Sequence, residues 1–526
     1  MEDRQNPKII LGFLILIFLL FILRLFQLQI VMGKANRFLA ENNRVRKIII
    51  PAQRGLFFDR HGEALVQNEP VYWLKEGSGS KKIPRKEALF LQSGGKEVEI
   101  SVKRNYLLNE TSAHLLGYLG EVSLEELKKN KLELSGYSPG SLIGRSGVEM
   151  QYERQLKGRD GSELVEVNTA GEVVRRINQV LPQPGESFTL AVDKKLQEVA
   201  AREMEGKKGA VIAGRPKSGE ILVLYSSPSF DPNEVVEAVS DEENFPLLNR
   251  VISGMFPPGS VFKIVTSIAG LEEGVITAST LINDPGVIEV NQFKFTNWYF
   301  TQYGRTEGEI NIVKALARST DTFFYRLGEK LGAEKLIQWV KKFNLDQKFG
   351  IDLPAESAGF VLTPEWKQQT RGESWFLGNT YHLAIGQGDI SLTPLGVNQM
   401  TSVVANGGKI CKPRVLRIGA ENTPYKEECF DLGIKEEYLE IVKKGMVGAC
   451  STGGTGYPFF DFEPRVACKT GTAETGDGKT SHAWFTVFAP ADNPEIVLTV
   501  LVERGGEGSS VAAPIAKEIL KEYFKD

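Results

Sequence analysis

The sequence predicts an α+β domain over residues 185–526, preceded by a membrane-spanning helix and by an extended, mainly β segment. Three observations support this organisation. An apolar run lies near the N-terminus, strand-like segments occur at both ends of residues 185–526, and helical and loop-like patterns dominate between about 255 and 450. One antiparallel sheet built from both ends, with helices inserted between them, accounts for this order. A chain of 526 residues is also longer than one hydrophobic core usually serves.

The apolar run covers residues 9–32 and contains a single charge, Arg24. A helix over these residues is roughly 36 Å long, which is enough to cross a bilayer. A cleaved signal peptide is the alternative, but the run is long and the following GKANRF is a poor cleavage site. We therefore expect a retained anchor. Its flanking basic residues do not decide its orientation, because large domains translocate largely regardless of such charges.

Composition excludes several classes of function. A net charge of −3 offers no electrostatic case for binding nucleic acid. The four histidines form no metal-ligand pattern with cysteines or carboxylates, and no Walker-type loop or GxGxxG after a strand occurs. A metal site or nucleotide chemistry is therefore not expected from these patterns.

The segment between the anchor and residue 185 reads mainly as strands and loops. Residues 33–75 alternate turn signals with short apolar runs, and residues 76–86 (EGSGSKKIPRK) are typical of a loop. Ser123 with Glu126 forms a capping box that predicts a short helix. Residues 144–161 predict another helix, followed by a strand-like stretch.

The predicted domain over residues 185–526, the larger domain, begins with a helical pattern over residues 194–206. Residues 209–227 then predict two strands around a turn at Pro216 and Gly219. Near the C-terminus three strand patterns follow one another, and an amphipathic helix closes the chain; the segments are RVACKTGT, HAWFTVFAP, EIVLTVLVER and SVAAPIAKEILKEYF.

Ser260 and Lys263 form a Ser-x-x-Lys pair inside the apolar run FPPGSVFKIVTS. Residues three apart on a helix share a face, so the two side chains can touch. Gly259 follows two prolines, which places Ser260 in the first helical turn, where free amides favour a developing oxyanion. Burial should lower the pKa of Lys263 and make it a base for the Ser260 hydroxyl. The pair therefore indicates a serine nucleophile.

A second Ser-x-x-Lys pair, Ser78 with Lys81, lies in the Gly/Ser-rich loop. Such a spacing arises by chance about once or twice in a chain of this length. In a solvated loop the amine keeps its proton, so we expect this pair to be inert.

Two further motifs lie downstream of Ser260. Ser319 and Asp321 follow a predicted helix, where a lone Ser-x-Asp most often caps a helix. A lysine and hydroxyls beside a glycine suit recognition of a carboxylate, and this pattern occurs on a predicted strand at Lys469, Thr470, Gly471 and Thr472. In the order Ser-x-x-Lys, Ser-x-Asp, Lys-Thr-Gly, the three motifs are far more specific than any one alone; the set is typical of penicillin-binding proteins and class A β-lactamases.

With these motifs the chain resembles a class B penicillin-binding protein, a bitopic peptidoglycan D,D-transpeptidase, and within that class penicillin-binding protein 2 of the elongation type. The resemblance covers nearly the whole chain. Beyond the anchor it rests on ENNRVRKIIIPAQRGLFFDRHGEAL, HLLGYLGEVS, GRSGVEMQYERQLKGRDG, FPPGSVFK, STDTFFY, TGTAE and AIGQGDISLTPL.

The resemblance implies a particular organisation. Residues 1–8 would be a cytoplasmic tail, 9–32 the single transmembrane helix, 33–184 an elongated, mainly β pedestal of the dimerisation type, and 185–526 the transpeptidase domain. That domain is expected to have the penicillin-binding and serine β-lactamase fold, a five-stranded antiparallel sheet with helices on both faces. It would lie outside the cytoplasmic (inner) membrane of a bacterium.

The resemblance also implies roles for the motif residues. Ser260 would be the acylated nucleophile and Lys263 its base, with Ser319 relaying protons and Asp321 holding Lys263 or the substrate amide. Lys469, Thr470 and Thr472 would bind the substrate carboxylate, with Gly471 between them, and the backbone amides of Ser260 and Thr472 would form the oxyanion hole.

The implied reaction is cross-linking of peptidoglycan stem peptides that end in D-Ala-D-Ala, during lateral-wall elongation and maintenance of cell shape. A weak D,D-carboxypeptidase side activity, inhibition by β-lactam antibiotics and a RodA-like membrane glycosyltransferase partner are also implied, with no cofactor.

The sequence departs from the family pattern at three places. Asp321 stands where Asn is usual, which favours the elongation branch and would raise the pKa of Lys263. Some relatives bind zinc near residues 283–305, but this stretch contains no Cys or His, so we expect no metal. The stretch between residues 75 and 105 is short, which predicts that the membrane-distal head of the pedestal is reduced.

Proteins of several other classes use the same motifs. A class A β-lactamase needs a deacylating glutamate, and no Glu-x-x-x-Asn occurs between Asp321 and Lys469. A bifunctional synthase would need a glycosyltransferase domain before the transpeptidase domain. Residues 33–185 occupy that position, and their sequence resembles a pedestal instead. A β-lactam sensor should carry more spans, and a non-catalytic scaffold would not need all three motifs. A division-type (septal) class B transpeptidase stays open as the alternative.

The four cysteines form two pairs that are local in sequence, Cys411 with Cys429 and Cys450 with Cys468. Disulfides persist outside the cytoplasm, so these two pairings are our hypothesis. Four cysteines allow three connectivities, and buried free thiols are a further alternative. His482 lies one strand from the Lys-Thr-Gly strand, and we expect a structural or substrate-lining role, because the chemistry needs no histidine.

Overall fold

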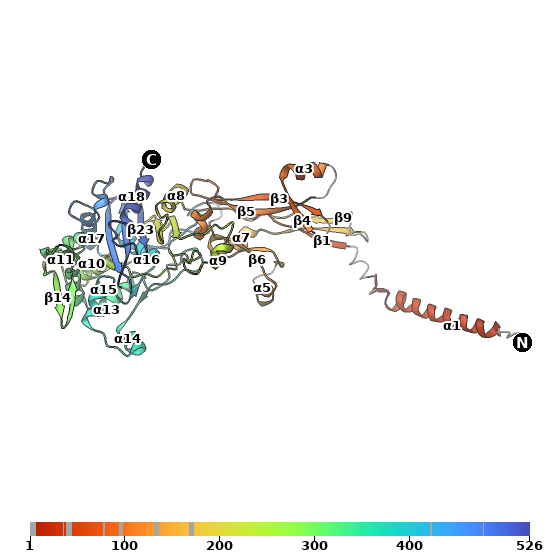
Figure 1. Cartoon of the computed structure of the whole chain (residues 1–526), viewed down its shortest axis with the longest axis horizontal. Helices are drawn as coiled ribbons and strands as arrows, with labels where there is room; N and C mark the ends of the chain where they lie inside the picture. The colour runs from red at the N-terminus through yellow and green to blue at the C-terminus, as the bar shows by residue number, and fades with distance from the viewer. Residues whose placement is uncertain are drawn as a thin grey trace. The chain divides into compact units, whose positions relative to one another are not determined.

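The computed structural model describes residues 7–34, 36–37, 45–76, 79–93, 98–130, 136–167, 173–420, 423–476 and 478–525 (Figure 1). Ser78 of the second Ser-x-x-Lys pair and most of the predicted N-terminal tail lie outside these residues. The chain divides into two compact units, one formed by Met1–Gly55 with Arg154–Glu186 and the other by Leu56–Glu153 with Ser187–Asp526.

The first unit contains the apolar helix α1 (Pro7–Phe26), which continues into a π-helical turn (Gln27–Val31). Ile9–Val31 is long and apolar enough to cross a membrane. The unit also contains an antiparallel three-stranded sheet in the order β1-β8-β9; the strands are β1 (Val45–Ile50), β8 (Gly161–Val167) and β9 (Val173–Val180).

The N-terminal part of the second unit is built on a sheet in the order β4-β3-β5, from β3 (Val66–Glu76), β4 (Gly79–Ile83) and β5 (Val98–Tyr106). The loop predicted over residues 76–86 is wrong, because β4 and the start of helix α3 (Arg85–Ser93) occupy it. Ile83 pairs with Tyr72 of β3, and both are buried with Ala88. This long-range pairing overrides the local Gly/Ser composition.

Short elements complete this part. The capping box is confirmed, since Ser123 and Glu126 exchange hydrogen bonds at the start of α5 (Leu124–Lys129). The single helix predicted within residues 144–161 is two short helices that meet at the buried Tyr152. The remaining elements of this part are β2 (Phe57–Phe58), a 3₁₀ turn (Asn109–Ser112), α4 (Ala113–Leu116), β6 (Leu119–Glu121), β7 (Leu142–Gly144), α6 (Gly147–Gln151) and β10 (Phe188–Thr189). Helix α7 (Glu153–Lys157) belongs to the first unit except for its first residue.

A five-stranded antiparallel sheet in the order β12-β11-β23-β22-β21 forms the centre of the larger domain (Figure 1). Its strands come from both ends of the domain, as predicted: β11 (Gly209–Gly214), β12 (Ile221–Ser227), β21 (Ala467–Glu474), β22 (Ser481–Ala489) and β23 (Ile496–Val502).

Helices cover both faces of this sheet. On one face α8 (Lys194–Glu203) and α18 (Ala512–Tyr523) pack against side chains such as Phe485 and Val487. On the other face Thr486, which lies between these two residues, hydrogen-bonds Thr401 of α16 (Pro394–Ala405) at 2.8 Å. Side chains alternate between faces along a strand, so each strand contributes to two cores.

The insertion between β12 and β21 is mostly helical, as expected. Its helices are α9 (Val236–Ser240), α10 (Lys263–Glu272), α11 (Trp298–Tyr303), α12 (Ile312–Arg318), α13 (Asp321–Lys342), α14 (Pro364–Arg371), α15 (Leu377–Ala384), α16 and α17 (Glu436–Ala449), with 3₁₀ turns at Gly259–Phe262 and Tyr457–Phe459. The insertion also contains short two-stranded antiparallel sheets. In these, β13 (Ile282–Asp284) pairs with β16 (Gly308–Ile310), β14 (Val287–Val290) with β15 (Phe293–Thr296), β17 (Phe360–Val361) with β18 (Ile390–Ser391) and β19 (Lys409–Cys411) with β20 (Cys429–Asp431).

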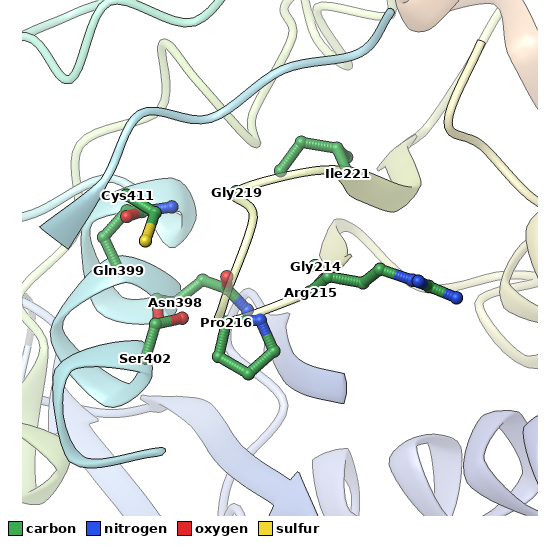
Figure 2. A pocket seen from close by; sticks show the side chains of 9 residues that line it. All are labelled: Gly214, Arg215, Pro216, Gly219, Ile221, Asn398, Gln399, Ser402 and Cys411. Carbon is green, nitrogen blue, oxygen red and sulfur yellow. The ribbon is translucent and has the colours of Figure 1, made fainter. Parts of the chain in front are cut away.

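Figure 2 shows the turn between β11 and β12, which contains Pro216 and Gly219 as predicted. Asn398, Gln399 and Ser402 of α16 lie beside it, and the surrounding atoms leave no room for a water molecule in the hollow. The candidate catalytic residues are all described, and none of them lines this hollow.

The structure pairs the four cysteines locally. Cys411 faces Cys429 across the β19–β20 pair, with Cα atoms 4.0 Å apart. Cys450, at the end of α17, is joined to Cys468 of β21, with Cα atoms 5.8 Å apart.

Candidate active site

Ser260 lies in the 3₁₀ turn that leads into α10, and its side chain is half-buried. The turn depends on two glycines in the left-handed region, Gly259 (φ 57°) and Gly386 (φ 72°), where other residues are strained. The Gly259 amide donates to Gly386 O at 2.8 Å. A Cβ on Gly259 would lie 2.9 Å from Thr472 O, so the turn packs directly against strand β21.

Lys263 is the first residue of α10, and its side chain is completely buried. Its Nζ donates to Asp321 Oδ1 at 2.6 Å, to Ser319 O at 2.8 Å and to Ser319 Oγ at 3.2 Å. The direct Ser260–Lys263 hydrogen bond that the spacing suggests is not among the contacts of the described residues. The reason is electrostatic, because the Asp321 carboxylate attracts the ammonium group.

Ser319 and Asp321 lie at the junction of two helices. Ser319 directly follows α12 and adopts the left-handed conformation (φ 55°), which is uncommon for a residue other than glycine. Asp321 is the first residue of α13. The Asp321 amide donates to Asn297 Oδ1 at 3.2 Å, and Asp321 Oδ2 accepts from the Trp298 amide at 3.3 Å. This junction therefore aims both polar side chains at Lys263.

Lys469 projects from β21 into the same place and is also completely buried. Its Nζ donates to Ser319 Oγ at 2.8 Å and to Thr470 O at 2.9 Å. Gly471 allows close packing, since a Cβ there would lie 3.1 Å from Val261 Cγ1, beside Ser260. The Thr472 side chain is exposed. The structure thus brings all three motifs together.

Burial controls the electrostatics of the two lysines. It lowers the pKa of Lys263, and the Asp321 carboxylate opposes this effect. The pKa of Lys469 lies well below its usual value, first because of burial and second because of the nearby Lys263 charge. The Asp321 carboxylate can balance the charge of one ammonium group but not of two. The site therefore favours loss of a proton from one of the two lysines.

A buried network behind Asp321 was missed by the sequence analysis. Asp284 accepts hydrogen bonds from Asn297 Nδ2 at 2.9 Å, Thr322 Oγ1 at 2.6 Å and the Gly286 and Glu307 amides at 2.9 and 2.8 Å. Asn297 connects this network to Asp321. The segment was noted only as a region where relatives bind zinc. Among the described residues, no group of three or more His, Cys, Asp or Glu could hold a metal ion.

His482 lies on β22, opposite Ala473 of β21. Its ring packs edge-on against Phe256 with centroids 5.4 Å apart, and its Nδ1 accepts a hydrogen bond from the Arg504 amide at 3.3 Å. These contacts support a packing role at the rim of the site.

Two domain profiles match the sequence. The penicillin binding protein transpeptidase domain matches residues 209–521, and the penicillin-binding protein dimerisation domain matches residues 80–190. Peptidoglycan D,D-transpeptidase MrdA of Haemophilus influenzae is 32% identical over 99% of this chain and 91% of its own length. MrdA of Escherichia coli K12 is 30% identical over 97% of this chain and 92% of its own length.

Solved structures agree with these matches. Penicillin-binding protein 2 (PBP2) of Helicobacter pylori, in a complex with MreC, has 30% identity and a TM-score of 0.79, covering 91% of this chain and 98% of its own. PBP2 of Pseudomonas aeruginosa, in complex with WCK 5153, has 32% identity and a TM-score of 0.75, covering 91% of this chain and 97% of its own. Together with the transpeptidase and dimerisation domains and the five-stranded sheet, these matches show that the chain belongs to the class B penicillin-binding proteins of the PBP2 type.

Proposed function

We propose that this chain is a peptidoglycan D,D-transpeptidase that cross-links stem peptides through an acyl-enzyme on Ser260. The observation that carries the proposal is the convergence of Lys263 and Lys469 on Ser319 Oγ, next to the turn that holds Ser260 against β21. A dry site with two amines and a bridging hydroxyl suits proton transfer to and from a serine nucleophile.

In the first step, Ser260 Oγ attacks the carbonyl carbon of the penultimate D-Ala and loses its proton to the Lys263–Ser319–Lys469 group. The amides of Ser260 and Thr472 stabilise the oxyanion. The peptide bond breaks, the proton passes to the leaving nitrogen, and the terminal D-Ala departs. Its carboxylate is held by Lys469, Thr470 and Thr472.

In the second step, an amine from a neighbouring stem peptide attacks the Ser260 ester. A new amide forms, the ester C–O bond breaks and Ser260 recovers its proton. Water in place of the amine would give the weak carboxypeptidase reaction. β-Lactams imitate the D-Ala-D-Ala end and stop at the first step, since the opened ring stays attached.

The anchor and the relatives support a proposal for the cellular setting. We place residues 9–32 across the cytoplasmic membrane, the pedestal (33–184) and transpeptidase domain (185–526) outside it, and residues 1–8 inside. The cysteine pairs support an oxidising outer compartment.

A role in lateral-wall elongation with a RodA-like glycosyltransferase is supported by two structural relatives. One is the H. pylori PBP2 complex with MreC. The other, described as "Structural coordination of polymerization and crosslinking by a peptidoglycan synthase complex", is 27% identical with a TM-score of 0.79 and covers 100% of this chain.

Labelling with fluorescent penicillin tests the proposal. The detergent-solubilised full chain should become covalently labelled, and Ser260→Ala should not. Ser267→Ala is the matched control, because Ser267 lies on the same buried helix and, within the described part of the chain, its hydroxyl donates only to the backbone O of Lys263. Labelling of the Ser260→Ala protein, or none of the wild type, would contradict the proposal.

A further inference from the structure

The Cys450–Cys468 disulfide joins the end of α17 to β21, the strand that also carries Lys469. Cys468 and Lys469 are neighbours on β21, so their side chains point to opposite faces of the strand. Both cysteines are buried, and Cys450 ends helix α17. A Cβ on Gly456 would lie within 2.9 Å of either sulfur, so the chain after α17 wraps closely around the pair. The pair therefore attaches α17 to the strand that carries Lys469.

The loop that follows Cys450, residues 451–456, contacts the Lys-Thr-Gly motif and the residue that precedes the Ser-x-Asp motif. Thr455 Oγ1 and Thr470 Oγ1 share a hydrogen bond of 2.8 Å. Gly453 O accepts from Arg318 Nη1 at 2.7 Å, and Arg318 directly precedes Ser319. The loop is thus bonded to Lys469's neighbour on one side and to Ser319's neighbour on the other.

Helix α17 is also packed tightly against α12, the helix that directly precedes Ser319. A Cβ on Gly445 would lie 2.7 Å from Leu316 Cβ, and one on Gly448 would lie 3.0 Å from Ala317 Cβ. Close packing of this kind transmits small displacements because the interior is hard to compress. Ser319, α12, α17, the cysteine pair and Lys469 therefore form a closed ring, completed by the Lys469–Ser319 hydrogen bond.

We propose that the Cys450–Cys468 disulfide and Thr455 are positioning residues for Lys469 and Thr470 in recognition of the substrate's terminal carboxylate. This inference rests on the proposed function of the same site. Without the bridge, β21 and loop 451–456 are held by non-covalent contacts alone, and Lys469 and Thr470 lose their exact spacing from the carboxylate.

The second cysteine pair provides a matched control. Cys411–Cys429 spans the same sequence separation of 18 residues and joins a short strand pair, β19–β20, to which no motif residue belongs. Four full-length proteins should be compared: wild type, Cys450→Ala/Cys468→Ala, Cys411→Ala/Cys429→Ala and Thr455→Val. The readout is the acylation rate with benzylpenicillin and with its methyl ester, which lacks the carboxylate.

With Cys450→Ala/Cys468→Ala, the rate for the free acid should fall about tenfold, because misplacing a binding group by about 1 Å costs up to ~100-fold. The ester rate should stay within about twofold of wild type, because the ester makes no charged contact with Lys469. Thr455→Val should shift the acid-to-ester ratio in the same direction but less. Cys411→Ala/Cys429→Ala should leave the ratio unchanged.

An equal loss for acid and ester would show a general structural role and overturn the inference, as would an unchanged ratio. If Cys450→Ala/Cys468→Ala fails to fold, Cys411→Ala/Cys429→Ala treated with a phosphine reductant isolates the same bridge, and Thr455→Val tests the loop with both bridges intact. Failure of the proposed function is distinguishable, because wild type would then show no Ser260-dependent labelling.

Discussion

Lys263 and Lys469 donate hydrogen bonds to the same atom, Ser319 Oγ, at 3.2 and 2.8 Å, but only Lys263 also contacts a carboxylate, Asp321. Two ammonium groups this close in a dry site repel each other. Lys469 is therefore the amine that more readily gives up its proton before substrate binds. A substrate carboxylate would supply the missing negative charge and favour the ammonium form of Lys469.

Replacing Asp321 with Asn should change the pH dependence of acylation. Burial lowers the pKa of Lys263 and Asp321 raises it again, so loss of the carboxylate lets this pKa fall further. The rate of penicillin acylation rises as the base loses its proton, so the acidic limb of the pH profile should move to lower pH. A limb that stays in place or moves to higher pH would contradict this assignment.

Lys469→Met should abolish labelling and stabilise the protein by about 1 kcal/mol at pH 7, because the variant no longer buries an amine next to the Lys263 charge. The folded pKa of Lys469 lies well below 10.5. Between the folded and unfolded pKa values the unfolded chain binds more protons, so the unfolding free energy of wild type rises with pH across that window. Denaturant unfolding at several pH values should show a weaker rise for the variant. A less stable variant with an unchanged slope would contradict the buried-amine account.

Gly259→Ala should slow acylation at least tenfold, since a Cβ would meet Thr472 O and displace Ser260 from β21. Gly274→Ala is the control. Gly274 follows α10, has a similar positive φ of 67° and would place its Cβ in open space. It should lose about 1 kcal/mol of stability through backbone strain and keep the acylation rate. Equal rates for the two variants would contradict the close approach.

Asp284→Ala should lower the unfolding free energy by about 2–4 kcal/mol, because several buried donors lose their acceptor. Acylation should also slow, since Asn297 then no longer holds the Asp321 amide in place. Chemical denaturation and the rate of penicillin labelling check the two effects. Asp231→Ala is a suitable control, because among the described residues its carboxylate accepts hydrogen bonds only from Asn233, in a partly exposed turn. A similar loss of stability in both variants would show that the Asp284 network has no special role.

Periodicity and motif order predicted much of this protein. The apolar anchor, the strand pairs at both ends of residues 185–526, the Pro216–Gly219 turn and the Ser123 capping box depend on neighbours in sequence. The order of the three motifs likewise identified the residues that meet in the site. Strand β4 was missed because its stability comes from pairing with β3, which local composition does not reveal.

The sequence by itself predicted the residues of the site and placed Ser260 one helical turn before Lys263. The tertiary structure alone decided where the Lys263 ammonium points, because its partners, Ser319 and Asp321, lie more than fifty residues away in sequence. It also placed Lys469 beside them and left two amines with one carboxylate. Long-range electrostatics and burial depend on which segments the fold brings together, and no local pattern contains that information.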